Sequence, residues 1–365
     1  MHLHRMGRRL AGVAAIAVAS VTAVSGAQAE TVETVARGLD NPRGVSLGPD
    51  GAVYVANAGR AGRNCRGRGD ERRCFGATGK IVRVEDGDKS VVGRGFLSIG
   101  APGGAFAAGV HGVSVGPDGN VFAVTGAGPP AYFKSLPRPV RQQAGRLFDV
   151  SGANLSAVAN IARFEFRRNT DNVKGDRNTN PYAVLAQANR QIVVDAGANA
   201  VLEVRNGEIG VLAVIPKNGK SQAVPTSIAE GPGGDLFVGE LIGAPREGGK
   251  GRARVWRVPA AGGTPTVHAT GFTTITGVAF GPDGSLFVTE FARNLRKEDK
   301  RGRVVRIAPD GSRTILGAGE LFTPTGAAVD ASGAVYVSNF SVLPRKTPKK
   351  GPFDGAGGTL VKITP

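Results

Sequence analysis

Short apolar runs alternate with turns rich in glycine and aspartate along almost the whole chain. Six segments share one pattern, in which two apolar runs flank the turn and a polar residue stands six positions after it. The clearest copies read GVSLGPDGAVYVAN at 44–57, GVSVGPDGNVFAVT at 112–125 and GVAFGPDGSLFVTE at 277–290, and the others lie at 182–195, 227–240 and 326–339. A repeat of this length indicates an array of small structural units.

Each copy predicts two strands joined by a tight turn. The proline of the G-P-D-G sequence presets one backbone angle, and the final glycine accepts a positive φ. The flanking runs are rich in β-branched and apolar residues, as strands are. Two further apolar segments follow in most copies, so each unit holds four antiparallel strands. Four-stranded units repeated around an axis form a β-propeller.

The repeats predict the number of blades and the place where the ring closes. We expect blades at about 41–98, 109–166, 181–216, 225–272, 275–320 and 324–364. The last of these lacks a fourth strand, and residues 31–39 can supply it and remove an open sheet edge. The fold class is therefore all-β, a six-bladed propeller completed by its N-terminal strand. A seven-bladed ring would need a spare repeat, and a β-sandwich would not carry this periodic turn.

The first 29 residues predict a secretory signal peptide rather than a part of the propeller. Arginines precede an apolar run at 10–24, and Ala27-Gln28-Ala29 is a small-residue cleavage site. The run is shorter than the roughly 20 residues of a comfortable membrane span. We expect residues 30–365 to be secreted, with no transmembrane segment left after cleavage. An uncleaved anchor is the alternative.

Cys65 and Cys74 are the two cysteines of the chain, and they flank a polar insert. In an exported protein a close pair predicts a disulfide. A zinc site would need further ligands nearby.

The chain is basic, with a formal net charge of +17, or +14 without the three arginines of the predicted signal peptide. The excess lies in segments at 60–73, 138–146, 163–177, 293–306 and 345–350. We expect no nucleic-acid partner for an exported protein. An anionic cell-wall polymer or glycan surface fits this charge, and so does a solvated surface that keeps a monomer soluble.

A binding site is predicted at the mouth of the central channel. The start of the first strand and the end of the second lie at one edge of each blade, so polar residues converge there as they do in ligand sites. An unknown small molecule or protein is the expected partner. The first-strand ring, with two flanking asparagines, consists of Arg43, His111, Pro181, Thr226, Thr276 and Thr325, with Asn41 and Asn180.

A second ring ends the second strands, at Asn57, Thr125, Asp195, Glu240, Glu290 and Asn339. Its three carboxylates come from consecutive blades and suit a hard cation such as Ca²⁺. The alternative is structural, because short polar side chains cap backbone N–H groups of loops and the offset is the same in every unit. His111 is a candidate general base or neutral ligand, with a buried, hydrogen-bonded histidine as the alternative.

Several stretches match a known family, among them GLDNPRGVSLGPDGAVYVANAG, VHGVSVGPDGNVFAVTGAG, VPTSIAEGPGGDLFVGELIGAP and the insert CRGRGDERRCFGATGKIVRV. Through them the chain resembles the ScyD/ScyE family of exported bacterial proteins over nearly all of 30–365. The resemblance implies a propeller of NHL-like repeats and export, and it brings no catalytic residues. A broader likeness is to gluconolactonase-like and regucalcin-like propellers, whose metal glutamate would fall where this chain has Asp40-Asn41-Pro42-Arg43.

Two functions are therefore expected. The first is a secreted, non-catalytic binding or scaffold propeller that uses the channel-mouth face. The alternative is a metal-dependent lactonase or hydrolase that uses Asp195, Glu240, Glu290 and His111.

Overall fold

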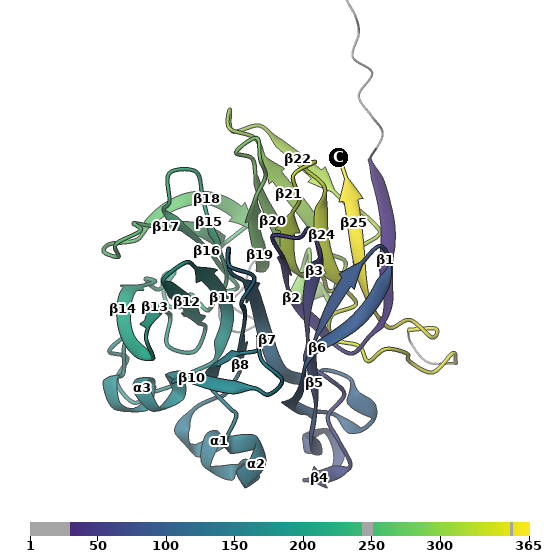
Figure 1. Cartoon of the computed structure of the whole chain (residues 1–365), viewed down its shortest axis with the longest axis vertical. Helices are drawn as coiled ribbons and strands as arrows, with labels where there is room; N and C mark the ends of the chain where they lie inside the picture. Colours follow the sequence, from purple (N-terminus) through teal and green to yellow (C-terminus); the bar gives the residue numbers. More distant parts are fainter. Residues whose placement is uncertain (1–29, 243–250, 351–352) are drawn as a thin grey trace, which may run out of the picture.

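The protein is a set of antiparallel β-sheets arranged around a common centre (Figure 1). The computed structural model describes residues 30–242, 251–350 and 353–365. The predicted signal peptide lies outside the described residues. No helix among the described residues is long and apolar enough to cross a membrane.

Three consecutive units form separate four-stranded sheets, each with its strands in chain order. The third unit holds β11 (Pro181–Gln187), β12 (Arg190–Asp195), β13 (Ala200–Arg205) and β14 (Glu208–Val214). The fourth holds β15 (Pro225–Glu230), β16 (Leu236–Glu240), β17 (Ala253–Val258) and β18 (Thr266–Phe272). The fifth holds β19 (Ile275–Phe280), β20 (Leu286–Glu290), β21 (Arg303–Ile307) and β22 (Arg313–Leu316).

The first two units are joined in one larger sheet, because the end of β6 (Asp88–Gly100) pairs with the start of β7 (Ala108–Val115). The first unit also contains β2 (Pro42–Leu47), β3 (Val53–Asn57), β4 (Asn64–Arg66) and β5 (Arg73–Glu85). The second continues with β8 (Val121–Thr125), β9 (Arg146–Asp149) and β10 (Ser156–Asn160).

The last unit combines the two ends of the described chain. Its sheet runs β1 (Thr31–Leu39), β25 (Gly358–Thr364), β24 (Val335–Asn339) and β23 (Thr325–Val329). β1 pairs with β25 from Thr31 opposite Thr364 to Leu39 opposite Gly358. The N-terminal strand therefore occupies the fourth position of this sheet.

The Asp-Gly turns form for the reason that the sequence suggests. The carboxylates of Asp50, Asp118 and Asp283 each accept a hydrogen bond from the backbone N–H two residues on, at 3.1, 3.1 and 2.9 Å. Such local bonds favour a turn. The following Gly51 and Gly284 have φ of 83° and 79°, which costs glycine little.

Apolar side chains fill the space between neighbouring sheets. One cluster joins Ile192 and Val194 of the third unit to Leu236 and Val238 of the fourth. A further cluster joins residues of the first unit, such as Val45 and Val55, to Ala328 and Leu360 of the last. Each sheet is thus stabilised by burial against its neighbours.

Long connections carry the helices and the disulfide. The helices are α1 (Pro130–Ser135), α2 (Arg138–Arg141) and α3 (Ile161–Arg168), with 3₁₀ turns η1 (Gly69–Glu71), η2 (Pro102–Gly104) and η3 (Leu295–Lys297). Cys65 of β4 and Cys74 of β5 stand opposite each other and form a disulfide. The predicted disulfide is confirmed.

A chain that begins at residue 40 should be much less stable than one that begins at residue 30. The lost strand covers the edge of β25 and contributes Ala36 and Leu39, which are 5% and 1% exposed. We expect a loss of at least about 3 kcal/mol of unfolding free energy, with self-association through the exposed edge. Urea unfolding and size-exclusion chromatography measure both. A chain that begins at residue 33 keeps both buried residues and is the control, and equal stability of all three chains would contradict the prediction.

Candidate functional site

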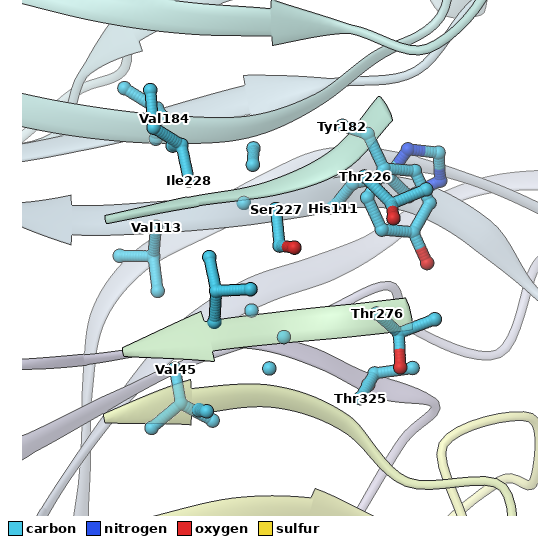
Figure 2. Close-up of a pocket in the computed structure, with 17 residues that line it drawn as sticks. Val45, His111, Val113, Tyr182, Val184, Thr226, Ser227, Ile228, Thr276 and Thr325 are labelled. Carbon is cyan, nitrogen blue, oxygen red and sulfur yellow. The ribbon is translucent and has the colours of Figure 1, made fainter. Parts of the chain in front are cut away.

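A small cavity of about 50 Å³ lies where β2, β7, β11, β15, β19 and β23 meet. Figure 2 shows that its two ends differ in polarity. The apolar end is lined by Val45, Val113, Val184 and Ile228, and the polar end by His111, Tyr182, Thr226, Thr276 and Thr325. The volume holds a few waters or one small polar group. It is far below the roughly 300–1,000 Å³ of a pocket that encloses a whole small molecule.

The polar residues of four units stand at β-bulges near the starts of the first strands. In the second unit Val110 pairs with Thr125 and Gly112 pairs with Val124, so His111 is the extra residue between them. Thr226 and Thr276 occupy the same place in the fourth and fifth units. A bulge leaves its extra residue out of the ladder and re-aims the side chain. The repeated irregularity thus places these side chains at the polar end of the cavity.

The third unit supplies Tyr182 rather than Pro181, which we expected in the ring. Pro181 pairs with Asp195 in the ladder, and Tyr182 is the residue that the bulge skips. In the second unit the ring residue is followed by a small residue and then an apolar one, Gly112-Val113, and Tyr182 is followed in the same way by Ala183-Val184. This pattern in the sequence could have identified Tyr182 as the ring residue.

The three threonines are used to join one unit to the next. The hydroxyl of Thr226 donates to the Ile275 carbonyl at 2.6 Å, and that of Thr276 donates to the Pro324 carbonyl at 3.0 Å. The Thr325 hydroxyl lies 3.2 Å from the Pro42 carbonyl of the first unit. Each bond connects first strands that are far apart in the sequence. These predicted ligand-binding residues therefore hold neighbouring units in register.

Arg43 is buried without a counter-charge. The residue is 8% exposed, and its Nη2 donates to the Ala107 carbonyl at 2.8 Å. Its buried Nε has no hydrogen-bond partner. None of the ion pairs among the described residues includes Arg43. Burial lowers the pKa of the guanidinium, as expected for a cation removed from water.

His111 is likewise buried and incompletely hydrogen-bonded. It is 5% exposed, and its ring packs on Tyr182 with centroids 4.8 Å apart. Nε2 accepts a long bond of 3.4 Å from the Gly109 N–H, whereas Nδ1 makes no hydrogen bond of good geometry. Burial, with a smaller contribution from the charge of Arg43, lowers the pKa of His111 to about 3, and a contact of the ring with the Pro181 backbone opposes this shift. The imidazole is therefore neutral near pH 7 and is a weak general base.

The flanking asparagines differ in their surroundings. Asn41 is fully buried, and its amide donates to the carbonyls of Gly59 and Gly104 at 2.8 and 2.7 Å, so it holds loops together. Asn180 lies beside His111. A Cβ on Gly126 would come within 2.3 Å of His111 Cε1 and 2.6 Å of Asn180 Oδ1. Glycine at this position lets the two side chains approach the same point.

Asp195 is surrounded by hydrogen-bond donors of the loop that follows it and of the segment before β11. One carboxylate oxygen accepts the backbone N–H groups of Asn180, Gly197 and Ala198 at 2.6, 3.0 and 3.2 Å. The other accepts the Thr179 hydroxyl at 2.5 Å. Burial raises the pKa of Asp195, and these bonds oppose the shift. The contacts match the capping alternative for the second ring.

Glu240 and Glu290 are fully buried and paired with arginines. Glu240 accepts bonds from Arg254 Nε at 2.7 Å and from Trp256 Nε1 at 2.9 Å. Glu290 accepts the Thr273 N–H at 2.6 Å and pairs with Arg303. Within the described residues, no three His, Cys, Asp or Glu side chains gather as a metal site would need. The structure does not bring the three predicted calcium ligands together.

Comparison with known proteins identifies the fold of this chain but no family. No protein-family model and no curated protein matches the sequence. A streptogramin B lyase is similar in structure, with a TM-score of 0.50, 13% identity and coverage of 92% of this chain and 97% of that one. A putative oxidoreductase (glucose dehydrogenase) from Thermus thermophilus has a TM-score of 0.52, 17% identity and coverage of 92% and 100%. Regucalcin, a calcium-binding protein from Agrobacterium tumefaciens, has a TM-score of 0.50, 14% identity and coverage of 89% and 91%.

The chain has a β-propeller fold. At these identities the likeness shows the fold alone, so the activities named for these propellers are not transferred to this protein. The ScyD/ScyE resemblance finds no family match and stays a prediction.

The stability of the propeller should fall with acid because of His111. In the unfolded chain the imidazole binds a proton near its ordinary pKa of 6.5, whereas in the folded protein it does so only at about 3. Stability is therefore present above pH 6.5 and is lost as the pH falls toward 3. From about pH 7.5 to about pH 5 we expect a loss on the order of 2 kcal/mol that is absent from His111→Gln.

Urea unfolding at a series of pH values measures this loss. His268→Gln is the matched control, because His268 lies on the exposed strand β18. Burial lowers the pKa of His268 as well, but less strongly, so this control should remove only a small part of the pH dependence. The same acid sensitivity in His111→Gln would show that the buried imidazole is not its source.

Glu240→Gln should cost about 3 kcal/mol, because it leaves Arg254 without its buried counter-charge. Glu203→Gln is the control, since Glu203 forms partly exposed pairs with Arg190 and Arg205 and should cost less than about 1 kcal/mol. Urea unfolding compares the two. Equal small losses would contradict the structural role, and a calcium-induced rise in Tm that Glu240→Gln abolishes would support the metal alternative.

Proposed function

We propose that this chain is an exported, six-bladed propeller of the ScyD/ScyE type that binds the head group of a ligand at its channel mouth and catalyses no reaction. The pairing of β1 with β25 and the apolar cluster between the last unit and the first support a closed ring of six blades. The disulfide between Cys65 and Cys74 fits an oxidising compartment outside the cytoplasm.

The observation that carries the binding proposal is that some polar groups around the central cavity have hydrogen-bond partners and others, including the lining hydroxyl of Ser227, have none. The hydroxyls of Thr226 and Thr276 donate to carbonyls of the next unit. The Thr325 hydroxyl lies 2.8 Å from Ser341 Oγ and 3.2 Å from the Pro42 carbonyl. Arg43 and His111, in contrast, keep buried nitrogen atoms without a hydrogen bond of good geometry. Buried polar groups are nearly always hydrogen-bonded, and exceptions call for an explanation such as a bound ligand.

The loops around the channel mouth form a fixed rim on which the rest of a ligand can lie. Asp40 is 1% exposed and pairs with Arg345 through both carboxylate oxygens. The backbone N–H of Asn41 donates to the Leu343 carbonyl at 2.7 Å, and that of Phe106 donates to the Val342 carbonyl at 2.8 Å. These contacts tie connections from different units together. A rigid rim above a small cavity suits a ligand that inserts only one polar group.

A non-catalytic role is supported by the state of the candidate catalytic groups. A histidine whose pKa is about 3 does not match the operating pH of a general base. Asp195, Glu240 and Glu290 each have protein donors on their carboxylates. The metal-dependent hydrolase remains the alternative, and the experiment below includes its substrates.

Thr276→Val should affect mainly stability, whereas Tyr182→Phe should affect mainly ligand binding. Thr276→Val removes the bond to the Pro324 carbonyl and should lower the unfolding free energy by about 1–2 kcal/mol while ligand binding is kept. Tyr182→Phe keeps the ring packing on His111 and removes the hydroxyl at the polar end. It should change stability by less than about 0.5 kcal/mol and weaken binding.

Thermal-shift screening of the unsubstituted chain against sugars, organic acids, alcohols and lactones provides the ligand for this comparison. Isothermal titration then gives the affinity of each variant. Equal affinity in Tyr182→Phe and the unsubstituted chain would show that the ligand does not bind at the channel mouth. Turnover of a lactone would show that the non-catalytic part of the proposal is wrong.

A further inference from the structure

We propose that the group bound at the channel mouth is an oxyanion, a carboxylate or phosphate head group, received by Arg43 and His111 beside Tyr182. This inference rests on the proposed function and adds the chemical class of the ligand.

The first step is the charge of Arg43. Three other arginines with largely buried side chains have carboxylate partners. The side chains of Arg190, Arg254 and Arg303 are 11%, 17% and 26% exposed, and they pair with Glu203, Glu240 and Glu290. Arg43 is 8% exposed and meets only a neutral carbonyl. A buried cation is costly unless a negative charge offsets it.

The second step is the proton of His111. Nε2 accepts the Gly109 N–H, so in the neutral ring the hydrogen is on Nδ1. That Nδ1–H makes no hydrogen bond of good geometry, although the ring contacts the Pro181 backbone. The buried Nε–H of Arg43 has no acceptor. Two donors without a good acceptor and one unpaired positive charge call for a group that only accepts hydrogen bonds and is negative. Carboxylates and phosphates have this character.

The third step is the shape of the cavity. About 50 Å³ suits a single head group. The valine-lined end offers an anion no partner, so the head group stays at the polar end near Tyr182 and the three threonines (Figure 2). The hydroxyls of Thr226 and Thr276 donate to backbone carbonyls. The donors left for the anion are therefore His111 and the unpartnered Ser227 hydroxyl, which line the cavity, and Arg43, which directly precedes the lining residue Gly44.

The probes are sodium acetate and sodium phosphate, each compared with sodium chloride at the same ionic strength. We expect a saturable rise in Tm with at least one of the two oxyanions, and the stronger of the two identifies the head group. Arg43→Gln should weaken that binding at least tenfold. Arg94→Gln makes the same change of charge at an exposed position of β6 and should bind as the unsubstituted chain does.

Stability in chloride alone separates a binding role from a structural one. Because Arg43→Gln removes an unpaired buried charge, its Tm should be equal to or higher than that of the unsubstituted chain. A lower Tm, with an oxyanion effect as large as before, would overturn the inference and show that the anions act on the basic surface. Arg43→Lys keeps the charge and should retain part of the binding, which covers the case in which Arg43→Gln does not fold.

The outcomes also distinguish this inference from the proposed function. If a neutral compound binds in a Tyr182-dependent manner and neither oxyanion has an effect, the proposed binding function is supported and the oxyanion inference is wrong. Anomalous diffraction from a selenate-soaked crystal gives a direct check on the unsubstituted chain. A selenium peak beside Arg43 and His111 supports the inference, and peaks confined to the surface contradict it.

Discussion

Burial of apolar side chains between neighbouring sheets is the interaction on which the rest of this structure depends. A four-stranded unit has two faces, and each face needs a neighbour to cover it. The clusters that join Ile192 to Leu236, and Val45 to Ala328, show that the covering residues come from the next unit rather than from the same sheet. Repeat proteins are stabilised in this way, by interfaces between adjacent repeats. The same packing holds the first strands close enough to enclose the central cavity.

Packing at the centre leaves little room, and the hydrogen bonds there decide what the room can hold. A β-bulge in each of several units turns one side chain out of its ladder. Where that side chain is threonine, it reaches the carbonyl of the next unit and strengthens the ring. Where it is His111, the ring contacts the Pro181 backbone of the next unit without a short hydrogen bond. The side of the channel with Arg43 therefore combines burial with unpartnered donors, which is the condition for binding an anion.

Much of the fold could be predicted because its signals are local. The Asp-Gly turns depend on bonds between residues two positions apart, and they form as expected at Asp50, Asp118 and Asp283. The disulfide of Cys65 and Cys74 followed from a short spacing. Of the first-strand positions that the sequence suggested, His111, Thr226, Thr276 and Thr325 line the central cavity. Tyr182 was missed because a bulge shifts the ladder by one residue. Bulges depend on pairing between strands, which counting positions along one strand does not reveal.

The sequence by itself determined the repeated strands, their turns and the polar positions at the ends of the strands. Only the tertiary structure decided which of those polar residues have partners. Asp195, Glu240 and Glu290 looked like ligands for a cation, yet their oxygens are taken by backbone N–H groups, a tryptophan and arginines. Arg43 and His111 looked no different from the threonines beside them, yet they keep buried donors without a good acceptor. Whether a polar group is satisfied depends on distances across the ring, between residues remote in the sequence, and those distances are set by packing.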